Sequence, residues 1–86
     1  MPSFLVETYL GRTEAAERGA RESRARSAAA GMTSVRFEGS IHVPEDEMCF
    51  FVFDAPTGRE AALAAQRAGL DAIRVVEAVS SEKEER

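Results

Sequence analysis

SVRFEGSIHVPEDEMCFFVF, residues 34–53, contains two segments with strand-like patterns joined by a turn. Residues 34–43 alternate with the period of two that a strand requires, and the Pro-Glu-Asp at 44–46 favours a tight turn. Residues 48–53 are apolar throughout, which is typical of a strand buried on both faces. The segment therefore predicts two antiparallel strands joined as a hairpin.

The first strand of this hairpin has one apolar set of positions and one polar set. The apolar set is Val35, Phe37, Gly39, Ile41 and Val43, and the polar set is Arg36, Glu38, Ser40 and His42. Side chains two residues apart share a face of a strand. We therefore expect the apolar set to face the core and the polar set to face away from it.

Before the hairpin, the pattern predicts a strand and a helix. Residues 3–10 alternate, with Leu5, Glu7 and Tyr9 on the side away from the core. Thr13 is expected to cap a helix that runs to about residue 30 and stops at Gly31. Its expected sheet-facing stripe consists of small residues, namely Ala16, Ala20, Ser23, Ser27 and Ala30.

After the hairpin, Thr57-Gly58-Arg59-Glu60 forms a capping box that predicts the start of a second helix. Its expected sheet-facing stripe is Ala61, Ala64, Ala65 and Ala68. Gly69 marks its end, and residues 73–79 predict a fourth strand. Residues 80–86 are polar and charged, so we expect a disordered tail after a single domain at 1–79.

The order of these elements is β-α-β-β-α-β. It predicts an α+β, ferredoxin-like sandwich, with a four-stranded antiparallel sheet and both helices on one face. The strands at 3–10 and 48–53 are then central, and the second face of the sheet is bare. Because a chain of 86 residues buries only a thin core, we expect a homodimer that covers this face.

Composition narrows the class of protein. A formal charge of -4 and a pI near 5.0 argue against a nucleic-acid partner. The first residues have no signal-peptide pattern, and the longest apolar run, 48–53, is too short to span a membrane. A single cysteine, Cys49, suits a reducing compartment. These observations predict a cytoplasmic protein without a membrane partner.

The candidate ligand-binding residues are Glu7, Tyr9, Glu38 and His42, which we expect to form a polar rim around the bare face. An ordinary polar dimer rim is the alternative interpretation. We assign no catalytic residue, metal ligand or cofactor, because one histidine and one cysteine cannot supply a metal site within one chain. A site shared by His42 and Cys49 across a two-fold axis stays open as an alternative.

The first helix also carries a basic patch. The patch consists of Arg18, Arg21, Arg24 and Arg26, with Glu14, Glu17 and Glu22 interleaved. Arginine and glutamate four residues apart can pair on a helix surface. We therefore interpret the patch as a solvated face with such pairs.

Three segments carry a resemblance to a known family. MPSFLVE at 1–7, FVFDAP at 51–56, and QRAGL at 66–70 followed by IRVVE at 73–77 resemble a bacterial family of short proteins of uncharacterised function, some described as nickel-binding. The resemblance spans 1–79. It implies a ferredoxin-like sandwich that dimerises in the manner of the dimeric α-β barrel superfamily, which includes cofactor-independent monooxygenases and stress-responsive domains.

The chain departs from this family at the positions that the resemblance associates with nickel. Nickel-associated members carry a histidine in the second helix, where residues 63–65 here are Leu-Ala-Ala. Many members carry a cysteine where Phe51 stands here. We therefore expect a non-catalytic dimeric module that binds a small ligand or a partner at the sheet face. The alternatives are a nickel-binding protein and a monooxygenase-like enzyme in which His42 or Tyr9 handles protons.

Overall fold

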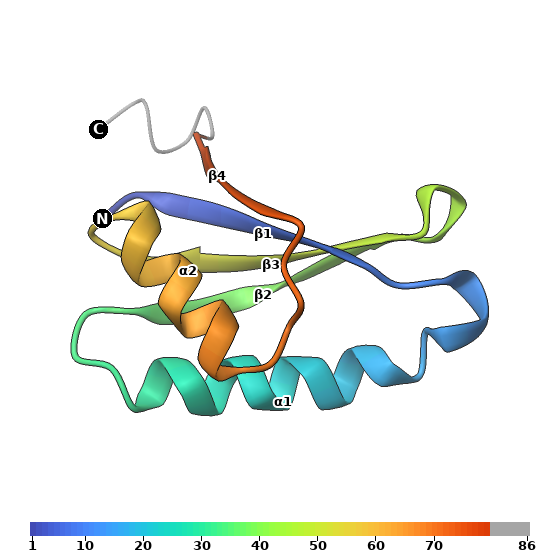
Figure 1. The fold of residues 1–86 in the computed structure, drawn as a ribbon, viewed down its shortest axis with the longest axis horizontal. Helices are drawn as coiled ribbons and strands as arrows, with labels where there is room; N and C mark the ends of the chain where they lie inside the picture. Colours follow the sequence, from blue (N-terminus) through green and yellow to red (C-terminus); the bar gives the residue numbers. More distant parts are fainter. Residues whose placement is uncertain (80–86) are drawn as a thin grey trace.

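The computed structural model describes residues 1–79, and eight elements lie along them (Figure 1). In chain order they are β1 (Ser3–Tyr9), η1 (Arg12–Glu14), α1 (Glu17–Ala30), β2 (Arg36–Val43), η2 (Pro44–Asp46), β3 (Met48–Asp54), α2 (Gly58–Arg67) and β4 (Arg74–Ala78), where η marks a short 3-10 helix. The charged tail expected at 80–86 lies outside the described residues.

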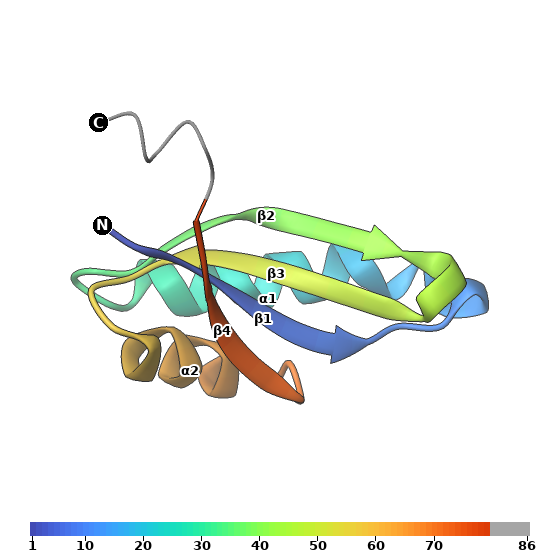
Figure 2. The ribbon, with the colours of Figure 1, turned by 90° about the horizontal axis from the view of Figure 1, so that it is seen from above.

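The four strands form one antiparallel sheet in the order β2-β3-β1-β4. Figure 2 shows them side by side, with α1 behind the sheet. This arrangement confirms the predicted α+β, ferredoxin-like order of elements, including the central positions of β1 and β3.

Both helices cover the same face of the sheet. Arg26 of α1 lies 5.2 Å above the Phe37 ring, and a Cβ at Gly58 of α2 would lie 3.3 Å from the Phe4 ring. Phe37 and Phe4 are both register partners of Phe53, so their side chains share one face. We call this side the helix-covered face and the other side the open face.

Alternate residues of the two central strands build the core on the helix-covered face. They are Phe4, Val6 and Thr8 of β1 and Cys49, Phe51 and Phe53 of β3. The expectation that β3 is buried on both faces is wrong for this chain by itself, because Met48, Phe50 and Val52 are only half-buried. The apolar character of those three residues is explained by neither α1 nor α2.

Helix α1 differs from its sequence-based expectation. Thr13 lies in η1 and caps nothing, and α1 begins at Glu17 after Ala16, which makes no side-chain cap bond. The expected stripe of small residues is also wrong, since Ala25 and Ala29 are the buried positions of α1. The first half of α1 instead contacts β2 through polar side chains, since Arg18 and Glu22 both bond to Ser40.

Helix α2 follows its sequence-based expectation. Thr57 Oγ1 accepts a hydrogen bond of 3.2 Å from the Glu60 N–H, as an N-cap requires. The predicted stripe is buried in full: Ala61, Ala64, Ala65 and Ala68. Gly69 ends the helix with φ of +67°, a left-handed conformation that glycine adopts without a steric penalty.

Within residues 1–79, neither α1 nor α2 has the length and the apolar composition needed to cross a bilayer.

Candidate functional site

The register of the sheet defines the open face, because side chains of paired residues point to the same side. Its residues form four rows across the strands. From the end nearest the N-terminus they are Arg36, Asp54, Ser3 and Ala78; then Gly39, Val52, Leu5 and Val76; then Ile41, Phe50, Glu7 and Arg74; then Val43, Met48 and Tyr9. Apolar residues therefore occupy the centre and the hairpin end of the face.

Nothing within residues 1–79 covers these apolar side chains. Tyr9 and Ile41 are 69% and 53% exposed, and Phe50 and Val52 are half-buried by their neighbours. Side chains of this kind on four adjacent strands form an apolar patch on the order of 400 Å². This area lies in the range of the largest patches that monomers expose, which are often functional.

One ion pair lies within the apolar rows. Arg74 Nε donates to Glu7 Oε2 at 2.9 Å, and the Glu7 side chain is only 13% exposed while Arg74 is 66% exposed. Glu7 belongs to the central strand β1, so its carboxylate lies inside the patch rather than at its edge. The pair gives the patch one fixed polar feature next to Phe50, the register partner of Glu7.

A β-bulge lies at the β2 edge of the open face. Phe37 pairs with Phe53 and Gly39 with Val52, so Glu38 is the extra residue. Glu38 Oε2 lies 3.9 Å from Arg36 Nε, and both side chains are largely exposed. Gly39 has φ of +140°, and a Cβ there would meet no atom within 4 Å. The position beside Val52, the register partner of Gly39, therefore carries no side chain on β2.

The bulge changes which of the predicted rim residues lie on the open face. Glu7 and Tyr9 lie on the open face as expected, Glu38 is the unpaired residue of the bulge at the edge of the sheet, and His42 pairs with Cys49 and lies on the helix-covered face. The extra residue inverts the alternation of β2, so Ile41 and Val43 reach the open face while Ser40 and His42 turn toward α1. The expectation that these four candidate residues share one face is therefore wrong for His42.

His42 is held at the end of the helix-covered face. Its Nε2 atom lies 3.1 Å from the backbone oxygen of Leu10, the residue that follows β1. This contact positions the imidazole beside the chain that leads into η1. His42 therefore cannot reach a ligand that sits above Tyr9 on the open face.

Sequence reasoning missed a polar cluster between α1 and β2. Arg18 Nε donates to Ser40 Oγ at 2.8 Å, and the Ser40 hydroxyl donates to Glu22 Oε2 at 2.6 Å. Arg18 Nη2 also donates to the Ser40 backbone oxygen at 2.9 Å, and Arg21 Nη1 to the Tyr9 oxygen at 2.8 Å. These bonds attach the first half of α1 to the sheet. The expected i to i+4 ion pairs of α1 are not among the ion pairs of residues 1–79.

Cys49 lies beneath this polar cluster. Its side chain is fully buried, and burial raises the pKa of the thiol despite the nearby charges of Arg18 and Arg21. A buried, neutral thiol behaves as a small apolar side chain. His42 and Cys49 are register partners on the helix-covered face, so a dimer that pairs two open faces would not bring them together around a metal; a site that they share across another two-fold axis stays a prediction.

Residues 1–79 contain no group of three or more histidine, cysteine, aspartate or glutamate side chains arranged to hold a metal ion.

No family model, no curated protein and no solved structure matches this chain. The resemblance to the family with nickel-binding members therefore stays a prediction.

Proposed function

We propose that this chain is a homodimeric binding module that associates through the open face and holds a small ligand or partner group between its sheets. The observation that carries the proposal is the register, which collects Leu5, Phe50, Val52 and their apolar neighbours on a face without cover from residues 1–79. Sheets stacked face to face lie about 10 Å apart. A second copy at that distance would bury these side chains.

The size of the patch limits the strength of this association. An interface of standard size buries about 800 Å² on each partner, which is roughly twice the apolar patch. Polar side chains at the edges of the face, among them Arg36 and Arg74, would have to supply the remainder as a rim. We therefore expect a dissociation constant nearer micromolar than nanomolar.

The ligand version of the proposal is supported by the chemistry of the same face. The floor of the site would be apolar, and the Glu7–Arg74 pair would supply one charged group of each sign within it. Tyr9 would contribute an exposed hydroxyl at the hairpin end. A ligand with an apolar body and one polar group fits this arrangement.

The alternatives have less support. Of the two residues expected to handle protons in a monooxygenase-like enzyme, only Tyr9 lies on the open face, since His42 lies on the helix-covered face. A nickel site between two paired open faces would lack both Cys49 and His42 for the same reason.

Sedimentation equilibrium between 1 µM and 500 µM tests the association. We expect a mass that rises toward twice 9.4 kDa for the wild type and stays at the monomer value for Ile41→Lys. Ile41 is 53% exposed in the single chain, so this change should leave the fold intact. Leu63→Lys is the matched control, because Leu63 is 37% exposed but belongs to α2 on the opposite side.

A monomer at every concentration, or equal dissociation in the two variants, would contradict the proposed association. The ligand version is tested separately by thermal denaturation with a panel of small amphipathic acids and amines. A ligand that binds the native state raises the unfolding temperature. We expect the shift to disappear in Glu7→Gln, and a panel without any shift would count against the ligand.

A further inference from the structure

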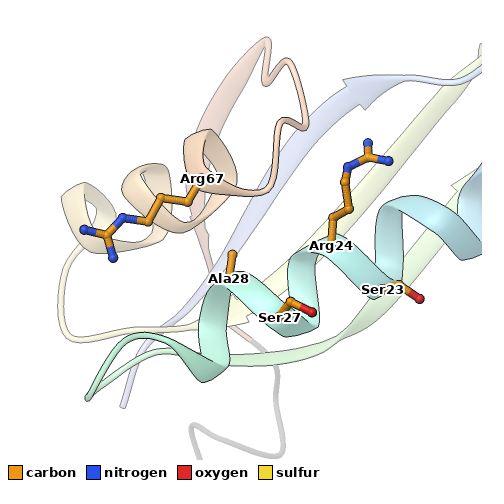
Figure 3. A pocket seen from close by; sticks show the side chains of 5 residues that line it. All are labelled: Ser23, Arg24, Ser27, Ala28 and Arg67. Carbon is orange, nitrogen blue, oxygen red and sulfur yellow. The ribbon is translucent and has the colours of Figure 1, made fainter.

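A groove lies between the two helices, on the side of the molecule opposite the open face. It measures about 420 Å³ and is lined by Ser23, Arg24, Ser27 and Ala28 of α1 and by Arg67 of α2 (Figure 3). Its polar groups are thus two guanidinium groups and two hydroxyls. All of them can donate hydrogen bonds, and none is a carboxylate.

The charge of the helical layer contrasts with that of the whole chain. Helices α1 and α2 together contain six arginines and three glutamates, a formal charge of +3, whereas the chain carries -4. No ion pair among residues 1–79 involves Arg24 or Arg67. The positive charge in the groove is therefore not neutralised locally.

Arg24 is partly fixed in position. Its Nε–H donates to the Ala68 backbone oxygen at the end of α2, at 2.8 Å. This bond uses one edge of the guanidinium group and leaves the two Nη groups free to donate. Arginine binds phosphate and carboxylate groups through such paired N–H donors.

Arg67 is exposed and has no fixed partner within residues 1–79. Figure 3 shows its side chain leaving α2 near Ala28, with the guanidinium group pointing away from Arg24. Exposed side chains change rotamer within nanoseconds, so Arg67 can turn toward the groove at the cost of rotamer entropy. This cost, and the open shape of the groove, point to weak binding.

We infer that the groove binds a phosphate group, either as the free ion or as part of a small phosphorylated molecule. Phosphate offers several acceptor oxygens and close to two negative charges near neutral pH. Its charge therefore matches the two guanidinium groups better than a carboxylate does, once Arg67 turns toward Arg24; the Ser23 and Ser27 hydroxyls point away from both arginines and are not counted as ligands (Figure 3). The inference is independent of the proposed dimer, because the groove lies on the helical layer.

A titration of the ¹⁵N-labelled full chain followed by NMR tests this inference. Inorganic phosphate is added at pH 7.5, with sodium chloride adjusted to keep the ionic strength constant. We expect saturable shifts confined to the amides around Ser23, Ser27 and Arg67, with a dissociation constant in the millimolar range. Glycerol 3-phosphate forms the second arm, and tighter binding of this ester would identify an organic phosphate as the ligand.

Two variants distinguish a specific phosphate site from non-specific attraction of phosphate to the positive charge of the helices. Arg67→Gln should weaken binding about fivefold, as expected for an exposed charged contact. Arg59→Gln removes the same charge from α2 outside the groove and should leave the affinity unchanged. Shifts that do not saturate by 50 mM phosphate, or an equal loss in both variants, would overturn the inference.

Discussion

Ser40 and Glu22 are joined by a hydrogen bond of 2.6 Å, and the same Ser40 hydroxyl accepts a bond from Arg18 at 2.8 Å. Ser40 belongs to β2 and the two charged residues belong to α1. The cluster replaces apolar packing at the first half of the helix, where α1 has no buried residue before Ala25. One hydroxyl therefore joins helix and sheet at this end of the fold.

Ser40→Ala should lower the free energy of unfolding by about 1 to 2 kcal/mol. It removes a donor and an acceptor, and water can replace them only in part because the site is half-buried. Urea denaturation followed by circular dichroism measures the loss. Ser23→Ala is the matched control, since Ser23 is exposed on the same helix and makes no bond to the sheet; an equal loss in this control would contradict the role of Ser40.

Thr57 and Thr13 provide a second matched pair. Thr57→Ala should cost about 1 kcal/mol, because the Glu60 N–H loses the side-chain oxygen that caps α2. Thr13→Ala should change the free energy of unfolding by less than about 0.5 kcal/mol, since Thr13 is exposed and caps no helix. The same urea denaturation compares them, and a larger cost at Thr13 would show that the helix begins where the sequence pattern placed it.

Gly39 gives the bulge its conformation. A φ of +140° is a region that residues with a side chain rarely adopt, although the space above Gly39 is open. Gly39→Ala should therefore destabilise the chain by about 1 to 3 kcal/mol through backbone strain. Gly19→Ala, within α1 and without a contact for the added Cβ, should instead stabilise it by about 0.5 to 1 kcal/mol.

The critical result is whether the two glycine variants change the free energy of unfolding in opposite directions. If both glycine variants stabilise the chain, Gly39 does not hold the positive φ. The bulge would then be absent, and His42 would return to the open face as the regular alternation of β2 predicts. The experiment therefore also tests which residues can form the ligand site.

The elements and their order follow from local patterns in the sequence. The Thr57 cap, the alanine stripe of α2 and the alternation of residues 3–10 each reflect interactions within a few residues, so they could be predicted. The faces of β2 could not, because a single extra residue at Glu38 exchanges the two faces beyond it. Gly39 within the strand was the one available signal, since glycine in a strand often marks a bulge.

The candidate site was predicted in part for the same reason. Glu7 and Tyr9 lie on a strand without a bulge, and their placement on the open face is confirmed. The pairing of Glu7 with Arg74 depends on the register between β1 and β4, which the sequence alone does not define. The polar cluster around Ser40 depends on how α1 is rotated about its axis. The interleaved arginines and glutamates of α1 predicted a solvated face, so contacts between them and the sheet were not expected.

Cys49 predicts a dependence of stability on pH. Burial raises the pKa of its thiol in the folded chain, whereas the unfolded chain has an ordinary thiol pKa of about 8.5. Above that pH the unfolded state loses a proton that the folded state keeps, so the free energy of unfolding falls as the pH rises toward the folded-state pKa. The contribution of the buried thiol is fully present below about pH 8.5.

The measurement compares the wild type with Cys49→Ala by urea denaturation at pH 7, 8, 9 and 10. We expect the wild type to lose up to about 1.4 kcal/mol more per pH unit than the variant above pH 8.5, because only the wild type has the thiol. Alanine at this position lowers stability at every pH, so the slopes decide the test and not the absolute values. Parallel slopes would mean that the Cys49 thiol ionises as easily in the folded chain as in the unfolded one, in conflict with its burial beneath Arg18 and Ser40.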